Sequence, residues 1–440
     1  MTQRQGLVRA RLETILERLH ARRDRERTFM ALYEQSAREE ADAADARRAT
    51  GTSHGALDGR IVSIKDLFDI AGEPTLAGSI IRRNAPVAAK DAEIVRRLKA
   101  AGAVIIGKTH MTEFAFTAVG LNPHYPVPGN ARDERLIPGG SSSGAAVSAA
   151  EGTCDIAIGS DTGGSVRIPA ALNGLVGFKP TARRIPLEGV FPLSPSLDSI
   201  GPLADSVDAC TLADAIMAGD SPRLPPPIPL PGLKIGIPRG RLLEALDDAV
   251  AAAYDRTLRY LANAGCALVD IALDDLLEEL AEATRIGSIA GIEASRIHAD
   301  WLPLEDAPVD IRVSATLRKR ASVSVADQTA LLAHRVTLAV CMNERLSPLD
   351  ALALPTTPIA AVPIERVETD EDEYRRVDGL LLRNTQVANQ FDLTAITLPV
   401  PGFFPPVGFM LMGANGSDRH LLGIARTIEA LLSVVRWNEL

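Results

Sequence analysis

The stretch DIAIGSDTGGSVRIPA, residues 155–170, passes from an apolar segment through a glycine-rich loop to a segment that contains a proline. Residues 155–158 predict a buried strand, and Pro169 stands where proline is favoured, in the first turn of a helix. Such a strand, loop and helix are typical of α/β proteins. The loop ends at Ser165, so the expected turn presents a hydroxyl group to its surroundings.

The same alternation recurs along the chain. Apolar residues 60–64 predict a short buried strand that ends at Lys65, and residues 91–101 predict a helix with Asp91 near its N-cap, followed by a strand over 103–106. We therefore expect an α/β protein whose sheet is covered by helices. Further segments predict strands over 234–237, 266–273, 351–354, 395–398 and 408–412, and helices over 241–264 and 420–432.

Three segments indicate the domain organisation. Residues 4–48 carry apolar side chains at helical spacing, which predicts an N-terminal helical segment over residues 1–50. The main domain is expected over residues 51–440. Within it, the proline-rich residues 221–232 predict a semi-rigid linker, and residues 274–349 predict a largely helical insert.

Composition excludes several classes of protein. Hydrophobic residues make up 46% of the 440 residues, and 47 basic against 56 acidic side chains give a net charge of −9, so direct binding to nucleic acid or to a membrane is not expected. No apolar run is long enough to span a bilayer, and the N-terminus lacks a signal-peptide core. The four cysteines show no zinc-site or disulfide spacing. We expect a cytoplasmic protein without a metal or another cofactor.

A second glycine-rich loop, PGGSSSGAA, occupies residues 138–146. Glycine loops at helix starts expose backbone N–H groups, which can bind a phosphate or the oxyanion of an acyl-transfer reaction. Neither GxxxxGK[ST] nor GxGxxG follows a predicted strand, which argues against a nucleotide site. A flexible loop without chemistry stays an alternative for either loop alone.

A serine nucleophile needs a proton acceptor. None of the seven histidines lies in a triad motif or at metal-ligand spacing, and no GxSxG turn surrounds Ser165. Burial lowers the pKa of lysine toward neutrality, so a buried Lys65 is the remaining local base.

These residues resemble the amidase signature family. The resemblance rests on VSIKD at 62–66, PGGSSSGAA at 138–146 and DTGGSVRIPA at 161–170, and it extends through GKT at 107–109, GFKPT at 177–181, LDSIGP at 197–202, LPTTP at 354–358 and VGFMLMG at 407–413. It implies that fold, a large mixed central sheet covered on both faces by helices. One departure is Phe409-Met410, where many members carry Leu-Gln.

The resemblance implies an amide hydrolase with a Ser-cisSer-Lys triad. Ser165 would be the nucleophile, Ser141, after a cis peptide bond, would relay the proton, and Lys65 would accept it. The oxyanion hole would consist of backbone N–H groups of Thr162, Gly163 and Gly164, together with that of Ser165. Asp161 and Arg167 would hold the loop by ion pairing. The expected substrate-binding residues are Met111, Phe116 and Ser142, with Phe114, Tyr125 and Phe191 nearby.

Three functions remain open at this point. The favoured one is an amidase acting on a small-molecule amide, with a homodimer as the expected assembly because family members are often dimers. The first alternative is the glutaminase A subunit of a tRNA-dependent amidotransferase, which would need partner subunits. The second, of another class, is a catalytically silent binding or scaffold protein. The sequence does not identify the amide.

Overall fold

The computed structural model describes residues 6–22 and 25–434. Within them eleven strands form one mixed sheet, in the order β1-β3-β2-β4-β6-β5-β10-β11-β9-β7-β8. Parallel pairs join β2 to β3 and β4, and β7 to β8 and β9, and the remaining pairs are antiparallel. The strands are β1 (Phe29–Leu32), β2 (Ile61–Lys65), β3 (Val104–Thr109), β4 (Ile156–Ser160), β5 (Val176–Lys179), β6 (Ile200–Ala204), β7 (Lys234–Arg239), β8 (Ala267–Ala272), β9 (Ala351–Pro355), β10 (Thr394–Val400) and β11 (Val407–Gly413).

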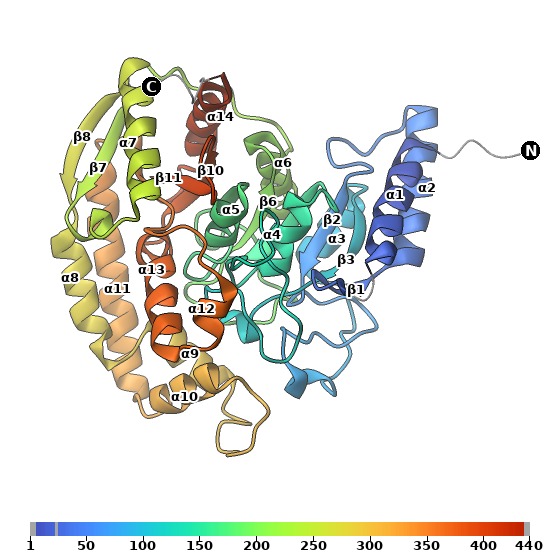
Figure 1. Cartoon of the computed structure of the whole chain (residues 1–440), viewed down its shortest axis with the longest axis horizontal. Helices are drawn as coiled ribbons and strands as arrows, with labels where there is room; N and C mark the ends of the chain where they lie inside the picture. The colour runs from blue at the N-terminus through green and yellow to red at the C-terminus, as the bar shows by residue number, and fades with distance from the viewer. Residues whose placement is uncertain (1–5, 23–24, 435–440) are drawn as a thin grey trace, which may run out of the picture.

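Helices cover both faces of this sheet (Figure 1). They are α1 (Leu7–Ala21), α2 (Glu34–Thr50), α3 (Glu93–Ala100), α4 (Ser143–Ala150), α5 (Arg167–Asn173), α6 (Val207–Ala218), α7 (Asp248–Asn263), α8 (Asp274–Ala283), α9 (Ile289–Ile297), α10 (Ile311–Arg320), α11 (Val325–Leu346), α12 (Ile364–Glu368), α13 (Glu371–Gln390) and α14 (Asp418–Val434). Short 3₁₀ turns are η2 (Ile80–Arg82), η3 (Glu113–Ala115), η4 (Arg241–Leu243) and η5 (Thr284–Ile286).

Alternating side chains of the buried strands show the two layers. In β4, Ile156 and Ile158 pack with α3, α6 and α14, whereas Ala157 packs with α1, α2, α4 and α5. In β11, Phe409 and Leu411 join the first of these layers, and Met410 and Met412 pack with α8, α11 and α13. Since neighbouring side chains of a strand point to opposite faces, both faces are covered. The predicted α/β fold with a large mixed sheet is confirmed.

Two predicted details are wrong. The helix expected over 241–264 begins only at Asp248, because Asp247 is tied to the segment after β9: its N–H donates to the Pro358 carbonyl, and its carboxylate accepts from the Ala360 N–H. Asp91 does not cap α3, whose N-cap is Ala92. Its carboxylate instead accepts hydrogen bonds from the Ala71 N–H and from Lys99.

The N-terminal and central segments add to the predicted pattern. A strand, β1, lies between α1 and α2 and pairs with β3, and the sequence did not predict it. Residues 1–5 and 23–24 of the predicted N-terminal segment lie outside the described residues. Residues 221–232 connect α6 to β7 without helix or strand, and residues 274–349 form α8 to α11 with the turn η5.

Two glycines make a matched test of this packing. A Cβ at Gly201 of β6 would lie 2.0 Å from the Phe178 carbonyl oxygen of β5, whereas a Cβ at Gly379, in the middle of α13, meets nothing within 4 Å. We expect Gly201→Ala to lower the free energy of unfolding by about 1–3 kcal/mol through overpacking. Gly379→Ala should raise it by about 0.5–1 kcal/mol by restricting the unfolded chain. Thermal unfolding midpoints check both, and an unchanged midpoint for Gly201→Ala would contradict the close approach of β5 and β6.

Candidate active site

Lys65 lies at the carboxyl end of β2, beside the carboxyl end of the parallel strand β4. Its side chain is fully buried, with Nζ 2.7 Å from the Ser141 hydroxyl and 2.9 Å from the hydroxyl of Ser160, the last residue of β4. Open α/β sheets place their sites at the carboxyl ends of parallel strands. The strand predicted before Lys65 therefore delivers its amine to the expected end of the sheet.

Ser141 reaches Lys65 from the glycine-rich loop that precedes α4. The Gly140–Ser141 peptide bond is cis, as the resemblance implies. The loop is fixed on both sides of this bond: the Gly140 N–H donates to the Ala118 carbonyl, and the Ser141 carbonyl accepts from the Thr112 N–H. Ser141 and Ser142 are both fully buried.

The second loop, residues 161–165, runs from β4 to α5 and ends at Ser165, which is 5% exposed. The Ser142 N–H donates to the Ser165 carbonyl at 3.4 Å, so the two predicted loops meet. Among the described residues, none accepts a hydrogen bond from the backbone N–H groups of 162–165, and none bonds to the Ser165 hydroxyl. Four N–H donors and one hydroxyl are thus left for a ligand.

A buried ion pair holds this loop. Arg167 donates two hydrogen bonds to Asp161, at 2.8 and 3.1 Å, and both side chains are fully buried. Burial alone would raise the pKa of Asp161, but the charge and hydrogen bonds of Arg167 lower it to about 2. Asp161 also accepts hydrogen bonds from the N–H groups of Val166 and Arg167 at the start of α5. The carboxylate therefore fixes the turn on which Ser165 lies.

Helix α13 supports the loop from the other side. The Thr385 hydroxyl donates to the Gly163 carbonyl at 2.7 Å, and the Asn389 amide donates to both the carbonyl and the carboxylate of Asp161 at 2.9 Å. Arg167 in turn donates to the Thr385 carbonyl and to the Asn389 side chain. A Cβ at Gly164, whose φ is +137°, would lie 2.1 Å from the Thr385 hydroxyl, so this position requires glycine.

Asp198 fixes the remaining part of the loop. Its carboxylate accepts a hydrogen bond from the Thr162 hydroxyl at 2.5 Å and from the N–H groups of Leu193 and Ser194. Burial raises the pKa of Asp198 to about 6, so the group is ionised at pH 7.

The charge state of Lys65 follows from its surroundings. Burial lowers its pKa to about 7, and the charges of Asp161 and Asp198 only partly oppose this effect. At neutral pH a large share of the Lys65 side chains is therefore an uncharged amine. Such an amine can accept a proton from Ser141, which an arginine in this place could not do.

The predicted substrate-binding residues fall in different places. Phe191 lines an enclosed cavity of about 230 Å³ that reaches Ser160 and Asp198, and it stacks on the buried Phe114. Phe116 lines a separate groove beside α10 and α13. Met111 is fully buried in the core, and Tyr125 lies beneath Arg83.

Several residues of this arrangement were missed in the sequence. Ser160, Thr385 and Asn389 received no role there, although each contacts Lys65 or the loop. Ser160 adjoins the predicted loop and could have been included on position alone. The helix α13 was not predicted, and its signal is a capping aspartate, Asp370, before three acidic residues.

Other sites find little support in the described part of the chain. There, no group of three or more His, Cys, Asp or Glu side chains is arranged to hold a metal ion. No helix among the described residues is long and apolar enough to cross a membrane. His110, the histidine that contacts the Ser141 loop, shares a hydrogen bond with the Ser143 hydroxyl, and burial lowers its pKa to about 3.

Comparisons with known proteins agree on one family. Residues 10–422 match the family model described as Amidase, so the chain belongs to the amidase family and is an amide-cleaving hydrolase. It is similar to 2-amino-5-chloromuconic acid deaminase from Comamonas testosteroni, with 36% identity over 90% of this chain and 86% of that protein.

Two further matches place the chain within this family. The glutamyl-tRNA(Gln) amidotransferase of Anaeromyxobacter dehalogenans (strain 2CP-C) has a glutaminase-type polypeptide that is 41% identical over 60% of this chain and 56% of its own length. A crystal structure of an amidase superposes with a TM-score of 0.85 at 34% identity, covering 97% of this chain and 96% of that one.

The Asp161–Arg167 pair makes a test of the loop support. We expect Arg167→Met to lower the free energy of unfolding by about 3–5 kcal/mol, because it leaves the Asp161 charge buried without its partner. The double variant Asp161→Asn with Arg167→Met removes both charges and should recover part of this loss. Thermal unfolding of the three proteins measures it. A double variant less stable than Arg167→Met would contradict the pairing.

Proposed function

We propose that the chain hydrolyses the carboxamide of a small molecule to a carboxylate and ammonia, or an amine, through an acyl-enzyme on Ser165. The observation that carries this proposal is the buried Lys65, whose amine lies 2.7 Å from the Ser141 hydroxyl and has a pKa of about 7. A lysine removed from water beside a hydroxyl group is suited to general base catalysis near neutral pH.

The first half-reaction forms the ester. The Ser165 oxygen attacks the amide carbonyl carbon, and its proton passes to Ser141 while the Ser141 proton passes to Lys65. The carbonyl oxygen becomes an oxyanion, which the free N–H groups of residues 162–165 stabilise; one donor of this kind contributes about 3 kcal/mol to the transition state. The C–N bond then breaks, and the proton held by Lys65 returns through Ser141 to the leaving nitrogen.

The second half-reaction restores the enzyme. A water molecule attacks the ester carbonyl carbon and loses its proton along the same path to Lys65. The ester bond to Ser165 breaks, the serine oxygen regains a proton through Ser141, and the carboxylate leaves. The Arg167–Asp161 pair and α13 act as positioning groups, since they hold the backbone of the loop and contact no reacting atom.

Coverage of the relatives favours a small substrate over a tRNA-linked one. The deaminase aligns with 90% of the chain and the amidase structure with 97%, whereas the aligned part of the amidotransferase polypeptide covers 60%. The deaminase is named for releasing an amino group from an organic acid, which is consistent with ammonia as the product here.

Ammonia release from a panel of small amides tests the proposed chemistry. We expect Ser165→Ala to lower kcat/KM by on the order of 10⁴-fold or more, because it removes the nucleophile. Lys65→Met should lower it by about 10²–10⁴-fold. Lys90→Met, which removes an exposed lysine, is the matched control and should leave kcat/KM unchanged.

The outcomes separate the three candidate functions. Release that survives Ser165→Ala would contradict the acyl-enzyme. Release only after partner subunits copurify would favour the role in an amidotransferase. No release, together with no labelling of Ser165 by a sulfonyl fluoride, would favour the silent scaffold.

The cavity at Phe191 makes a separate prediction about substrate choice. Because Phe191 lines the cavity that reaches Ser160, we expect Phe191→Ala to change the ranking of amides in the panel by about tenfold, through roughly 1–3 kcal/mol of lost apolar contact. Phe116→Ala, in the separate groove beside α10, is the comparison. A larger change for Phe116→Ala would place the substrate in that groove instead.

A further inference from the structure

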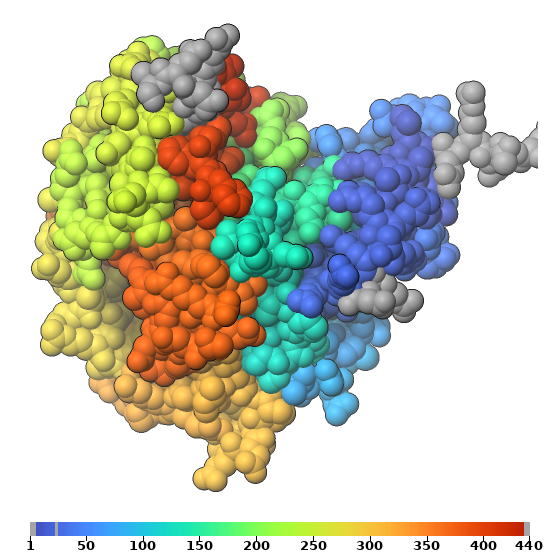
Figure 2. Space-filling view, viewed as in Figure 1, coloured from blue at the N-terminus to red at the C-terminus, as the bar shows by residue number. Residues whose placement is uncertain are grey.

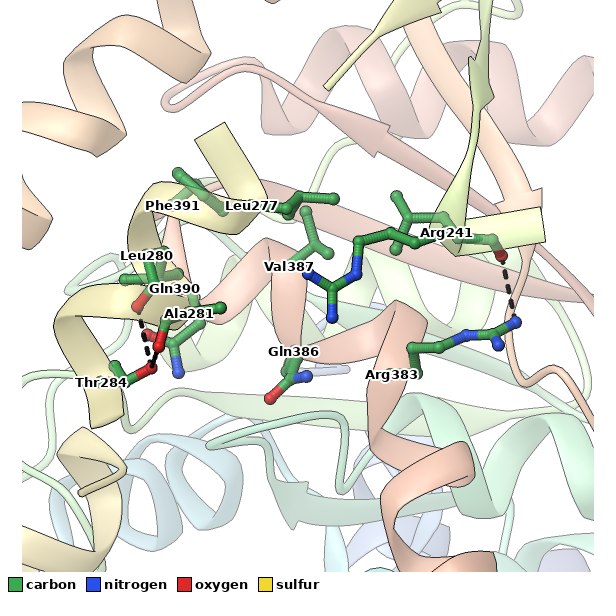
Figure 3. Close-up of a pocket in the computed structure, with 11 residues that line it drawn as sticks. Arg241, Leu277, Leu280, Ala281, Thr284, Arg383, Gln386, Val387, Gln390 and Phe391 are labelled. Atoms are coloured by element: carbon green, nitrogen blue, oxygen red, sulfur yellow. Dashed lines mark hydrogen bonds between the residues drawn. The ribbon is translucent and has the colours of Figure 1, made fainter. Parts of the chain in front are cut away.

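A pocket of about 560 Å³ lies between η4, α8 and α13, apart from the cavity at Ser160 (Figure 3). Two arginines and several apolar side chains form it. Figure 3 shows Arg241 extending from η4 across Val387 of α13, with Leu280, Ala281 and Thr284 on the opposite side. None of these residues takes part in the proposed reaction.

The two arginines have no acidic partner. Neither Arg241 nor Arg383 has a carboxylate oxygen within 4.0 Å among the described residues, although ion pairs are frequent elsewhere in this chain. Arg383 makes only long hydrogen bonds, at 3.4 Å to the Leu242 carbonyl and 3.3 Å to the Asn384 side chain. Burial and the charge of Arg241 lower the pKa of Arg383, and the more distant Glu244 only partly opposes this. An anion between the two guanidinium groups would relieve their repulsion.

The rest of the pocket specifies more than a charge. Leu277, Leu280, Val387 and Phe391 give it an apolar wall. At its inner end the side-chain carbonyl oxygen of Gln390 is buried and accepts no hydrogen bond from any described residue. Because a buried acceptor without a donor is costly, a ligand hydroxyl or N–H group would satisfy it.

The same helix connects this pocket with the nucleophile loop. Arg383, Val387 and Gln390 line the pocket, and the neighbouring positions Thr385 and Asn389 bind residues 161 and 163. A ligand that orders α13 on one side therefore acts on the element that holds the loop on the other.

We propose that this pocket binds a small organic carboxylate with an apolar body and one hydroxyl or N–H group, and that its occupancy changes the turnover of the enzyme through α13. The carboxylate would lie between Arg241 and Arg383, because a guanidinium matches a carboxylate with two parallel hydrogen bonds. The effect on turnover rests on the proposed function, whereas the binding site does not.

Calorimetric titration of the full-length Ser165→Ala protein tests the site without requiring activity. The probe is 3-phenyllactate, and its neutral match is 3-phenylpropane-1,2-diol, which keeps the ring and hydroxyl and lacks the carboxylate. We expect Arg241→Gln and Arg383→Gln, each combined with Ser165→Ala, to weaken binding of 3-phenyllactate about tenfold or more, since each removes a charge-assisted hydrogen bond. Arg285→Gln, which removes an exposed arginine paired with Glu282 beside the pocket, is the matched control.

Three results would overturn the site: no binding of 3-phenyllactate, equal binding of the diol, or equal affinity in the pocket variants and in Arg285→Gln. The last would place the carboxylate elsewhere, as product in the catalytic centre. For the turnover effect, 3-phenyllactate should change the kcat of ammonia release by the protein with an intact Ser165, and Arg383→Gln should abolish this response. Binding at the pocket with unchanged kcat would overturn the coupling through α13.

Discussion

The burial of one lysine amine among hydroxyl groups is the constraint on which the site depends. Lys65 ends a strand whose five residues are all buried, so its amine cannot reach water and lies between Ser141 and Ser160 instead. Removing an ammonium from water is costly, which favours the neutral amine near pH 7. Asp161 and Asp198 prevent the pKa from falling further, and the same two carboxylates position the nucleophile loop.

The loop itself needs support from a distant part of the chain. Residues 161–165 present their N–H groups inward, so their own backbone cannot hold them. Arg167 binds Asp161 from the next helix, and Thr385 and Asn389 bind the loop from α13, more than two hundred residues away (Figure 2, where α13 adjoins the earlier segments). The Arg167 guanidinium also lies 3.3 Å from the sulfur of Met410, at the family position where many members carry glutamine. This account explains why a buried ion pair is retained beside the reacting serine.

The sequence predicted what local pattern determines. Apolar runs before Lys65 and before the loop at 161–165 located β2 and β4, and the glycine-rich loops located both serines. Features set by tertiary contacts were not predictable in this way. The helix expected from residue 241 is interrupted because Asp247 bonds to residues 358 and 360. The role of α13 depends on polar residues buried against a distant loop, and β8, expected from its alternation, is an edge strand that is mostly exposed.

The pH dependence of Ser165 acylation tests the neutral lysine most directly, because it needs no knowledge of the substrate. The rate of labelling of Ser165 by a sulfonyl fluoride would be followed by intact mass from pH 5 to 9. Deprotonation of Lys65 supplies the base, so the rate should rise with pH, with a midpoint near the pKa of about 7, and then level off. In Lys65→Met the rate should be low, without this midpoint. A wild-type rate that is independent of pH in this range, or that has the same midpoint in Lys65→Met, would contradict the account.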